Sequence, residues 1–435
     1  MVAMQRGVWH YIFLRGLSKV FLSRKLARGG RRDETLLLAM HTSDFLVVGG
    51  GVVGVCVARA LKSRFGGRVR LIEKEPECGL HASGRNSGVI HAGFYYSADS
   101  LKAKFTRAGN RALTAYCESK GIPLNRCGKL VVAQGPADLP QLDELLRRGR
   151  ANDVPLESIS EEEARKIEPR VKTLERAIFS PTTSSADPAR VIAALKEDAQ
   201  TEGVEVTTGA AYLRMDGGAV VTSAGRFEAG HVVNAAGLYA DQIALDFGFS
   251  EKYRILPFKG LYLYSEEPVG AFRTNIYPVP DLRNPFLGVH FTVKADGRIK
   301  IGPTAIPAFW REQYRGFDNF KFGEFVEVLF REAGLMFSSN FDFKKLAIEE
   351  IQKYSRPHLV SLAARLAQGV RPEDYRQWGE PGIRSQLLNI KERKLEMDFV
   401  VEGDAGSTHI LNAVSPGWTC AMPFAEYVVD GIEKR

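Results

Sequence analysis

The sequence has few cysteines and no motif that pairs them. Five are present, an odd number, and no C-x-x-C spacing occurs: Cys56, Cys78, Cys117, Cys127 and Cys420. This set argues against a disulfide framework and against a structural zinc site, because both need paired cysteines. Cys56 lies within an apolar helical pattern and is expected in the core. The sequence therefore fits a reducing compartment.

Several other signatures are missing. The sequence has no P-loop, no G-x-S-x-G turn and no metal-binding pattern among its eight histidines, and the acidic run at 161–163 is typical of a solvated helix face. No apolar run approaches the roughly 18 residues that a membrane-spanning helix needs. These absences disfavour a P-loop nucleotidase, a serine hydrolase, a metal centre and an integral membrane protein.

Positive charge is concentrated at the N-terminus. The formal net charge is +8, and residues 1–39 contribute six of these charges through eight basic and two acidic side chains. About +2 remains on the other residues, so no basic surface is expected and no nucleic-acid partner is predicted.

The N-terminal 39 residues have the composition of a leader. They are rich in Arg and Lys, and one helical face would carry bulky apolar residues: Trp9, Ile12, Phe13, Leu17, Val20 and Phe21. This pattern predicts a mitochondrial transit peptide, with the mature protein in the matrix or at the inner-membrane surface. The alternative is upstream sequence without a targeting role, with translation starting at Met40.

A glycine-rich turn gives the clearest functional signal. Residues 45–48 form an apolar strand pattern, Gly49, Gly51 and Gly54 follow as G-x-G-x-x-G, and residues 52–64 have a helical pattern. Gly49 permits the tight turn, Gly51 lets the backbone approach a pyrophosphate, and Gly54 lets helix and strand pack closely. The turn therefore predicts a dinucleotide site.

An acidic residue completes this βαβ unit. A second strand is expected at 69–72, and Glu73 follows it, 24 residues after Gly49. A carboxylate there accepts hydrogen bonds from ribose hydroxyls and disfavours a 2′-phosphate, which argues against NADP. Lys74, beside it, is included among the predicted cofactor contacts.

The segments that would return to the cofactor favour a flavin over NAD. Residues 78–105 contain a long Gly- and Ser-rich loop with Arg85, Asn86 and Ser87, followed by a helix from about Ser100, whereas NAD enzymes usually continue into an ordinary helix. Gly237 ends a strand pattern, and Ser415, Gly417 and Trp418 precede a C-terminal helix whose positive end is suited to a reduced flavin.

These motifs resemble a known superfamily. The chain is similar to the FAD-dependent oxidoreductases of the D-amino-acid-oxidase and glycerol-3-phosphate-dehydrogenase type, and within it to the L-2-hydroxyglutarate dehydrogenases. The matching blocks cover almost the whole body: HASGRNSGVIHAGFYY (81–96), GKLVVA (128–133), IYPVPD (276–281), PFLGVHFT (285–292), GRIKIGP (297–303) and GIRSQL (382–387).

The resemblance implies FAD as cofactor and an α/β fold, α+β overall. A Rossmann-like FAD-binding domain would be interleaved with an antiparallel-sheet substrate domain carrying helices. The predicted FAD-binding segments are 43–115, 185–249 and 381–435, and the predicted substrate-domain segments are 116–184 and 250–380.

Oxidation of a 2-hydroxy acid needs a base for the hydroxyl proton and cations for the carboxylates. His290 is the predicted base or substrate hydrogen-bond partner, and His91 is predicted to contact flavin or substrate. Arg384 and Lys259 are candidate carboxylate ligands, and Tyr95 is a candidate pocket residue. For each, the alternative is a structural role in the core or at the surface.

The predicted reaction is oxidation of L-2-hydroxyglutarate, or a close 2-hydroxy dicarboxylate, to 2-oxoglutarate. Electrons would pass from the flavin to a quinone or another acceptor, which allows a peripheral membrane contact. Two alternatives stay open: an amine oxidase of the glycine or sarcosine oxidase kind, distinguished by peroxide release, and a catalytically silent FAD-binding assembly protein, distinguished by a flavin that no small acid reduces.

Overall fold

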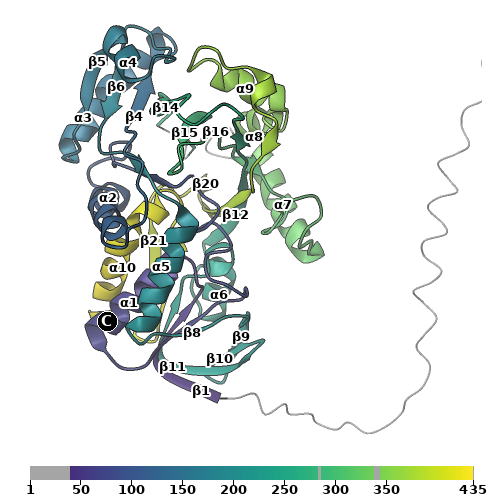
Figure 1. Cartoon of the computed structure of the whole chain (residues 1–435). Helices are drawn as coiled ribbons and strands as arrows, with labels where there is room; N and C mark the ends of the chain where they lie inside the picture. Colours follow the sequence, from purple (N-terminus) through teal and green to yellow (C-terminus); the bar gives the residue numbers. More distant parts are fainter. Residues whose placement is uncertain (1–39, 283–285, 338–342, 435) are drawn as a thin grey trace, which may run out of the picture. The chain divides into compact units, whose positions relative to one another are not determined.

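The computed structural model describes residues 40–282, 286–337 and 343–434, and these residues belong to one compact unit (Figure 1). The predicted transit peptide, residues 1–39, lies outside the described residues. No helix among those described has the length and apolar composition to cross a bilayer.

An eight-stranded sheet carries the glycine-rich turn. Its central strand β1 (Met40–Val48) runs parallel to β2 (Val69–Ile72) on one side and to β11 (Gly225–Asn234) on the other. The strands β8 and β22 continue the parallel order, β21 is an antiparallel edge, and β9 and β10 form a meander with β11. The remaining strands of this sheet are β8 (Glu205–Thr207), β9 (Tyr212–Asp216), β10 (Ala219–Thr222), β21 (Val400–Gly403) and β22 (Ser407–Asn412).

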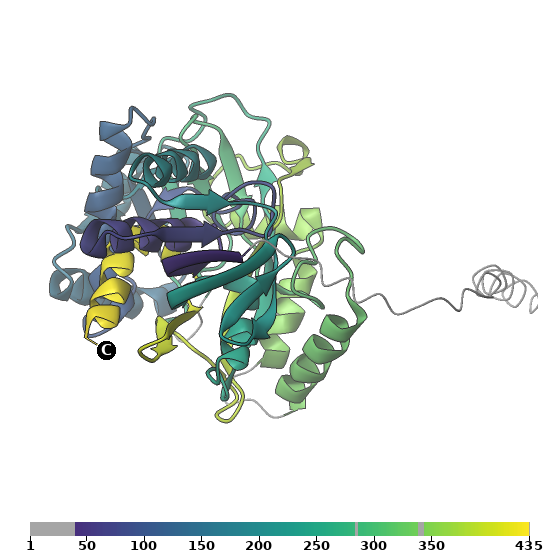
Figure 2. The same cartoon turned by 90° about the horizontal axis from the view of Figure 1, so that it is seen from below.

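The side chains of this sheet alternate between its two faces, so each face packs in a core of its own, and helices cover one of them. Val47 and Leu71 pack in the core that holds four helices, while Leu46 and Ile72 face the meander and the short helix α6 (Ala240–Asp246). Figure 2 shows α1 and α10 beside each other. The four helices are α1 (Val52–Phe65), α2 (Leu101–Ser119), α5 (Pro188–Thr201) and α10 (Gly417–Glu433).

A second eight-stranded sheet forms most of the predicted substrate domain. Its order is β18-β13-β16-β15-β14-β4-β6-β5, and all its pairs are antiparallel except β14 with β4. The helices α3 (Leu139–Ala151), α4 (Glu161–Ile167) and α9 (Arg356–Ala363) accompany it. The strands are β18 (Gln377–Trp378), β13 (Leu263–Tyr264), β16 (Ile299–Gly302), β15 (His290–Val293), β14 (Asn275–Pro278), β4 (Lys129–Val132), β6 (Arg176–Ser180) and β5 (Glu157–Ser160).

A smaller sheet, order β17-β12-β19-β20, packs against α7 and α8. A two-stranded ribbon pairs β3 with β7, and three short 3₁₀ turns complete the fold. The elements are β17 (Ile306–Pro307), β12 (Tyr253–Gly260), β19 (Gly382–Asn389), β20 (Lys394–Leu395), α7 (Phe322–Phe337), α8 (Phe343–Gln352), β3 (Val89–Ile90), β7 (Ser184–Ser185), η1 (Pro136–Asp138), η2 (Gly237–Tyr239) and η3 (Pro372–Asp374).

Two elements differ from what their sequence patterns predict. The apolar pattern FKGLYLYSEE (258–267) predicts one strand, but β12 ends at Gly260 and the chain enters the other sheet at β13. The pattern of residues 358–368 predicts a helix over that range, but the observed helix spans Arg356–Ala363. It ends early because the following residues pair elsewhere: the carbonyl of Leu366 accepts a hydrogen bond from the Lys172 amide at 2.9 Å.

Candidate active site

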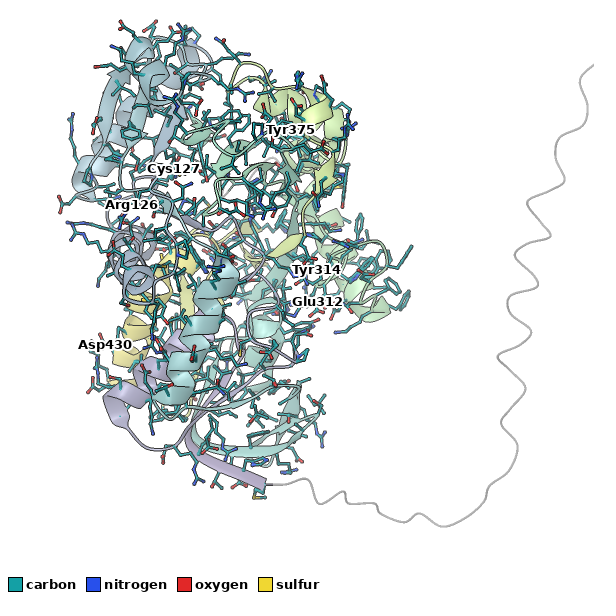
Figure 3. All side chains as sticks on the ribbon, in the orientation of Figure 1. Arg126, Cys127, Glu312, Tyr314, Tyr375 and Asp430 are labelled. Atoms are coloured by element: carbon teal, nitrogen blue, oxygen red, sulfur yellow. The ribbon has the colours of Figure 1, made fainter. Side chains whose placement is uncertain are left out.

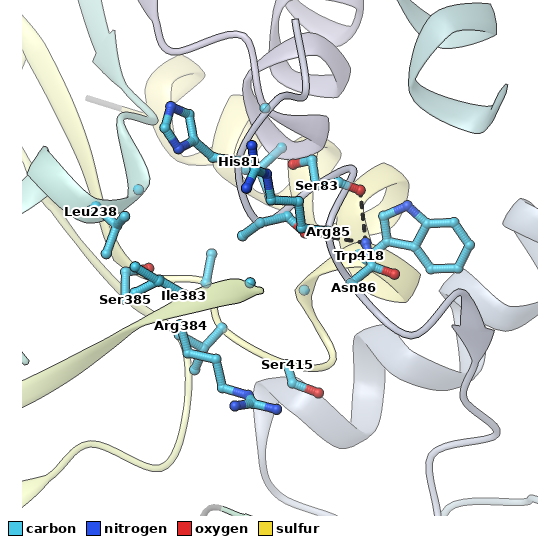
Figure 4. Close-up of a pocket in the computed structure, with 18 of the residues that line it drawn as sticks. His81, Ser83, Arg85, Asn86, Leu238, Ile383, Arg384, Ser385, Ser415 and Trp418 are labelled. Carbon is cyan, nitrogen blue, oxygen red and sulfur yellow. Dashed lines mark hydrogen bonds between the residues drawn. The ribbon is translucent and has the colours of Figure 1, made fainter. Parts of the chain in front are cut away.

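One cavity of about 700 Å³ collects residues from distant parts of the chain (Figure 4). Its wall includes the turn between β1 and α1, the loop at 81–91, the strands β15 and β19, and the start of α10. Of the seventeen predicted site residues, fourteen line it, and Gly54, Lys259 and Tyr95 lie outside it. The fourteen are Gly49, Gly51, Glu73, Lys74, Arg85, Asn86, Ser87, His91, Gly237, His290, Arg384, Ser415, Gly417 and Trp418.

The glycine-rich turn has the backbone that the sequence predicts. Gly49 has φ +112°, a conformation open to glycine, and a Cβ there would lie 2.5 Å from the Ala235 carbonyl oxygen. Gly54 does not line the cavity. It faces the turn itself, where a Cβ on it would lie 1.9 Å from the Gly49 carbonyl oxygen. The two glycines therefore let β1, α1 and the end of β11 approach at the N-terminus of α1.

Glu73 lies at the end of β2 and is buried at 7% exposure. One carboxylate oxygen accepts the Gly50 amide at 2.7 Å, and the other accepts the Glu75 amide at 2.9 Å. Each oxygen keeps a further lone pair, so the carboxylate is oriented and still able to accept hydrogen bonds from hydroxyls. Beside it, the Lys74 ammonium pairs with Glu312 Oε1 at 2.8 Å.

Short hydrogen bonds fix the loop at 81–91. Ser83 Oγ accepts the first amide of α1, from Val52, at 2.8 Å. Asn86 donates to the Ser83 carbonyl at 2.7 Å and accepts the Gly88 amide at 2.8 Å, and Ser87 Oγ accepts the Val89 amide at 3.3 Å. The loop is thus held against α1 by its own polar side chains.

Arg85 points to protein groups in this loop. Its Nε donates to the Leu80 carbonyl at 2.7 Å, and its guanidinium lies 4.4 Å from the ring centroid of Tyr314. Tyr314 and Glu312 project from the loop that follows β17 (Figure 3). Arg85 therefore joins the 81–91 loop to that second loop at the cavity wall.

The start of α10 closes another part of the wall. Gly417, Trp418 and Thr419 line the cavity, and no side chain caps this helix of 17 residues. Trp418 Nε1 is buried without a hydrogen-bond partner among the described residues. A helix N-terminus with a nearby unpaired donor is suited to an oxygen atom that carries negative charge.

The cavity fits FAD on these observations. It has a glycine cradle at the N-terminus of α1, an oriented carboxylate at the end of β2, and an uncapped helix N-terminus with the unpaired Trp418 donor. These groups suit a pyrophosphate, a ribose and an electron-rich ring oxygen, respectively.

His290 lies on β15 with its ring toward the cavity side of the sheet. Phe291 points to the opposite face and packs with Leu359 and Val360 of α9. The His290 ring is stacked on Tyr277, with centroids 3.6 Å apart and an interplanar angle of 15°. The alternation of side chains along the strand thus places the histidine at the site and the phenylalanine in the core.

The hydrogen bond of His290 sets its tautomer. Nδ1 lies 3.0 Å from the Gly288 carbonyl oxygen, which only accepts, so Nδ1 carries the proton and Nε2 keeps its lone pair in the neutral ring. Burial, and then the positive charge of Lys129, lowers the pKa of His290 well below 6.5. The neutral form is therefore the stable one near pH 7, as a proton acceptor requires.

His91 also lies at the cavity wall. Its backbone amide donates to Thr419 Oγ1 of α10 at 3.2 Å, and burial lowers the pKa of its side chain well below 6.5. The residue therefore joins the 81–91 loop to α10 and presents a neutral imidazole.

Arg384 supplies a cation from β19. Its guanidinium donates to the Thr304 carbonyl at 2.9 Å and lies 5.8 Å from the ring centroid of Phe286. It makes no ion pair with a carboxylate among the described residues. Burial lowers its pKa, but a guanidinium still keeps its charge at neutral pH. Its remaining donors are suited to a carboxylate ligand.

Two predicted substrate residues do not reach the cavity wall. Lys259 pairs with Ile383 across β12 and β19, whereas Arg384 pairs with Phe258, so strand alternation places the two cations on opposite faces. Burial lowers the pKa of Lys259 to about 8. Tyr95 is buried and does not line the cavity; its ring centroid lies 4.4 Å from that of Phe94, and the two rings are tilted. The predicted substrate contacts of Lys259 and Tyr95 therefore remain predictions.

Three residues at or behind the site were not singled out from the sequence. Ser83 and Tyr277 line the cavity, and Lys129 lies behind Tyr277 on the neighbouring strand. All three fall within blocks that carry the family resemblance. Ser83 had a detectable signal, as a small hydroxyl residue in the polar loop, but a lysine within the apolar strand pattern KLVV gives no sign of full burial.

The sequence is similar to known proteins over most of its length. Residues 44–431 match the family described as FAD dependent oxidoreductase. The chain is 35% identical to the mitochondrial L-2-hydroxyglutarate dehydrogenase of Bos taurus and to that of Homo sapiens, and each match covers 95% of this chain and 92% of the relative. It is 32% identical to the L-2-hydroxyglutarate dehydrogenase of Escherichia coli K12, over 90% of this chain and 93% of that protein.

Solved structures share the fold. L-alpha-glycerophosphate oxidase from Mycoplasma pneumoniae, a structure with FAD bound, superposes with a TM-score of 0.72 at 22% identity, over 91% of this chain and 95% of that one. Glycine oxidase from Geobacillus kaustophilus gives 0.68 at 21% identity, with the same two coverages. The predicted fold class, with a Rossmann-like FAD-binding domain, is confirmed.

Proposed function

The chain belongs to the family of FAD-dependent oxidoreductases, and from this premise we propose that it oxidises L-2-hydroxyglutarate to 2-oxoglutarate. Relatives from mammals and bacteria that match nearly its whole length carry the name L-2-hydroxyglutarate dehydrogenase. The observation that carries the proposal is that one cavity holds a neutral imidazole, a guanidinium without a carboxylate partner, and the groups that fit FAD.

The residues that would hold the cofactor divide into three groups. Gly49, Gly51 and the N-terminus of α1 would bind the pyrophosphate, Glu73 would accept the ribose hydroxyls, and the start of α10 would face the flavin. FAD supplies the acceptor for the two electrons of the oxidation.

The protein's own side chains would perform the acid–base and binding work. His290 Nε2 accepts the proton of the substrate hydroxyl, and the Nδ1 bond to Gly288 fixes the ring for that role. Arg384 binds a substrate carboxylate through its free donors. His290 is 4% exposed, and away from bulk water the charge of Arg384 interacts more strongly with a dianionic substrate.

The electron acceptor and the location of the protein are also part of the proposal. We propose that a quinone or another carrier takes the electrons from the flavin, with peripheral contact to a membrane. We also propose that residues 1–39 direct the protein to mitochondria, in line with the bovine and human relatives, whose names include that location.

Anaerobic reduction of the flavin tests the substrate. The full-length protein, loaded with FAD, is mixed with L-2-hydroxyglutarate without oxygen, and the visible flavin absorbance is followed. Rapid bleaching with the L form and none with the D form is expected. Bleaching with sarcosine, glycine or proline instead would move the assignment to amine oxidation, and bleaching with none of these would contradict the proposal.

A further inference from the structure

Lys129 is a buried cation that the proposed reaction does not yet use. It lies on β4 at 0% exposure, and its Nζ has no hydrogen-bond partner among the described residues. A lysine is almost never fully buried without a partner. Its position therefore calls for a physical reason.

Aromatic rings take the place of a hydrogen-bonding partner. Lys129 Nζ lies 4.4 Å from the ring centroid of Tyr277, 5.0 Å from that of Tyr95 and 5.4 Å from that of Phe94. Ammonium groups within about 6 Å of a ring face are attracted by its quadrupole, and more strongly when water is absent. The three rings form an aromatic cage that favours the charged form of the lysine.

Sheet register connects this cage to His290. On β14, Asn275 is paired with Lys129 of β4, so Tyr277, two residues on, shares a face with the lysine. On the other side of β14, Ile276 is paired with Phe291 of β15, which puts His290 opposite Tyr277. Since β14 lies between β4 and β15, the Tyr277 ring is flanked by the ammonium and the imidazole.

We propose that Lys129 is a positioning residue for His290: its caged ammonium group, acting across the Tyr277 ring, keeps the His290 imidazole unprotonated and ready to accept the substrate proton. The proposal rests on the function proposed above for His290. It gives the aromatic cage a purpose, because a nearby fixed cation destabilises an imidazolium ion.

The charges around His290 agree with this role. Lys129, His91 and Arg384 disfavour a further positive charge on His290, the hydrogen bond to the Gly288 carbonyl favours one, and no carboxylate is among the groups that influence its protonation. Burial lowers the pKa of Lys129 to about 7, and Cys127, just before β4 (Figure 3), opposes that shift. The pKa of His290 lies well below 6.5, so the lysine remains charged over the range in which the histidine titrates.

The test is the titration of His290 in the FAD-loaded, full-length protein without substrate, followed by NMR of ¹³C-labelled histidine rings. Lys129→Met is expected to raise the His290 pKa by about one unit, a tenfold change in proton affinity. Lys129→Arg is expected to keep it low. Because substrate is absent, this result does not depend on which acid the enzyme oxidises.

Lys300→Met is the matched control. Lys300 is also buried and lies 4.2 Å from the ring centroid of Tyr262, but it is not among the groups that influence His290. Its replacement is expected to leave the His290 titration unchanged. An unchanged titration in Lys129→Met, or an equal rise in Lys300→Met, would overturn the proposal.

A measurement on the unaltered protein covers the case in which Lys129→Met does not fold. In ¹⁵N-lysine-labelled enzyme, the Lys129 ammonium signal is expected to persist throughout the pH range in which His290 titrates. A neutral Lys129 amine in that range would refute the proposal without any substitution.

Discussion

Among single residues, His290 has the most direct role in the proposed reaction. Its Nε2 is the available acceptor because Nδ1 is engaged with the Gly288 carbonyl. Replacement by glutamine keeps a polar side chain but removes the base. We expect His290→Gln to slow anaerobic flavin reduction by about 10²- to 10⁴-fold while the flavin spectrum of the resting protein stays unchanged. Reduction at the rate of the unaltered protein would exclude His290 as the base.

The pH dependence of the same step has a definite sign. The imidazole accepts a proton only when neutral, so the rate falls as the pH drops through the pKa of His290. Burial and Lys129 lower that pKa well below 6.5. Stopped-flow reduction at saturating substrate should therefore give a constant rate from about pH 8 to 6.5 and a decline only below it. A decline centred above pH 6.5 would contradict this.

Arg384 is expected to act through binding. Loss of its guanidinium removes charge-assisted hydrogen bonds to a carboxylate, which should raise the dissociation constant of 2-oxoglutarate by roughly 10- to 100-fold in Arg384→Met. The measurement is a titration of the flavin spectrum with this product, which binds without turnover. Arg384→Lys keeps the charge without the planar guanidinium, so its dissociation constant should lie between those of the unaltered protein and Arg384→Met.

The sequence predicted some site residues well and others poorly, for physical reasons. The glycines, Glu73 and His290 stand in local patterns that determine their geometry, so their positions follow from the chain alone. Lys259 lies on the opposite face of its sheet from Arg384, and this placement depends on the register of β12 with β19, which local sequence does not contain. Lys129 was missed because its cage is assembled from segments distant in sequence.

Among the elements, the turn between β1 and α1 is the one most sensitive to a small change. A Cβ at Gly54 would lie 1.9 Å from the Gly49 carbonyl oxygen, so Gly54→Ala must separate helix and strand. We expect at least a tenfold loss of FAD affinity, measured by the ratio of flavin to protein absorbance after dialysis.

The control for this change lies in α10. Gly431 has open space around its Cβ position and sits within the helix. Gly431→Ala should retain FAD and raise stability by up to about 1 kcal/mol, because alanine favours a helix over glycine. Equal FAD retention in both variants would show that close packing at Gly54 is not needed for binding.

Element boundaries were predictable where local chemistry sets them. The sequence pattern after Asp187 predicts a helix over 188–201, and the structure has it as Pro188–Thr201, with the Asp187 carboxylate capping its N-terminus at Ala189. By contrast, β1 begins at Met40 instead of Phe45, because residues 40–43 pair with 226–229 of β11. The extra pairs come from a strand that lies more than 180 residues away in the sequence.

For the molecule as a whole, a buried ion pair joins the loop after β17 to α6. Arg311 and Asp241 side chains are both fully buried, with NH1 to Oδ1 at 2.7 Å and NH2 to Oδ2 at 3.0 Å. Arg311→Met leaves an unpaired buried carboxylate, which should lower the free energy of unfolding by about 3–5 kcal/mol. Urea unfolding of the FAD-loaded protein measures this.

A double substitution separates charge from packing. Arg311→Met combined with Asp241→Leu removes both charges and should recover much of the lost stability. If the double variant loses as much free energy of unfolding as the two single variants lose together, the ion pair is not the origin of the lost stability.

The long-range pairing of the first sheet has a consequence for biosynthesis. Its central strand β1 is made early, but its neighbour β11 pairs with β22, and the wall of the cavity is completed by α10, which ends at Glu433. The nascent chain therefore cannot complete this sheet until β22 has left the ribosome, nor the cavity wall until α10 has. A stop codon at Gly417 would remove the whole of α10, and we expect the resulting polypeptide not to retain FAD.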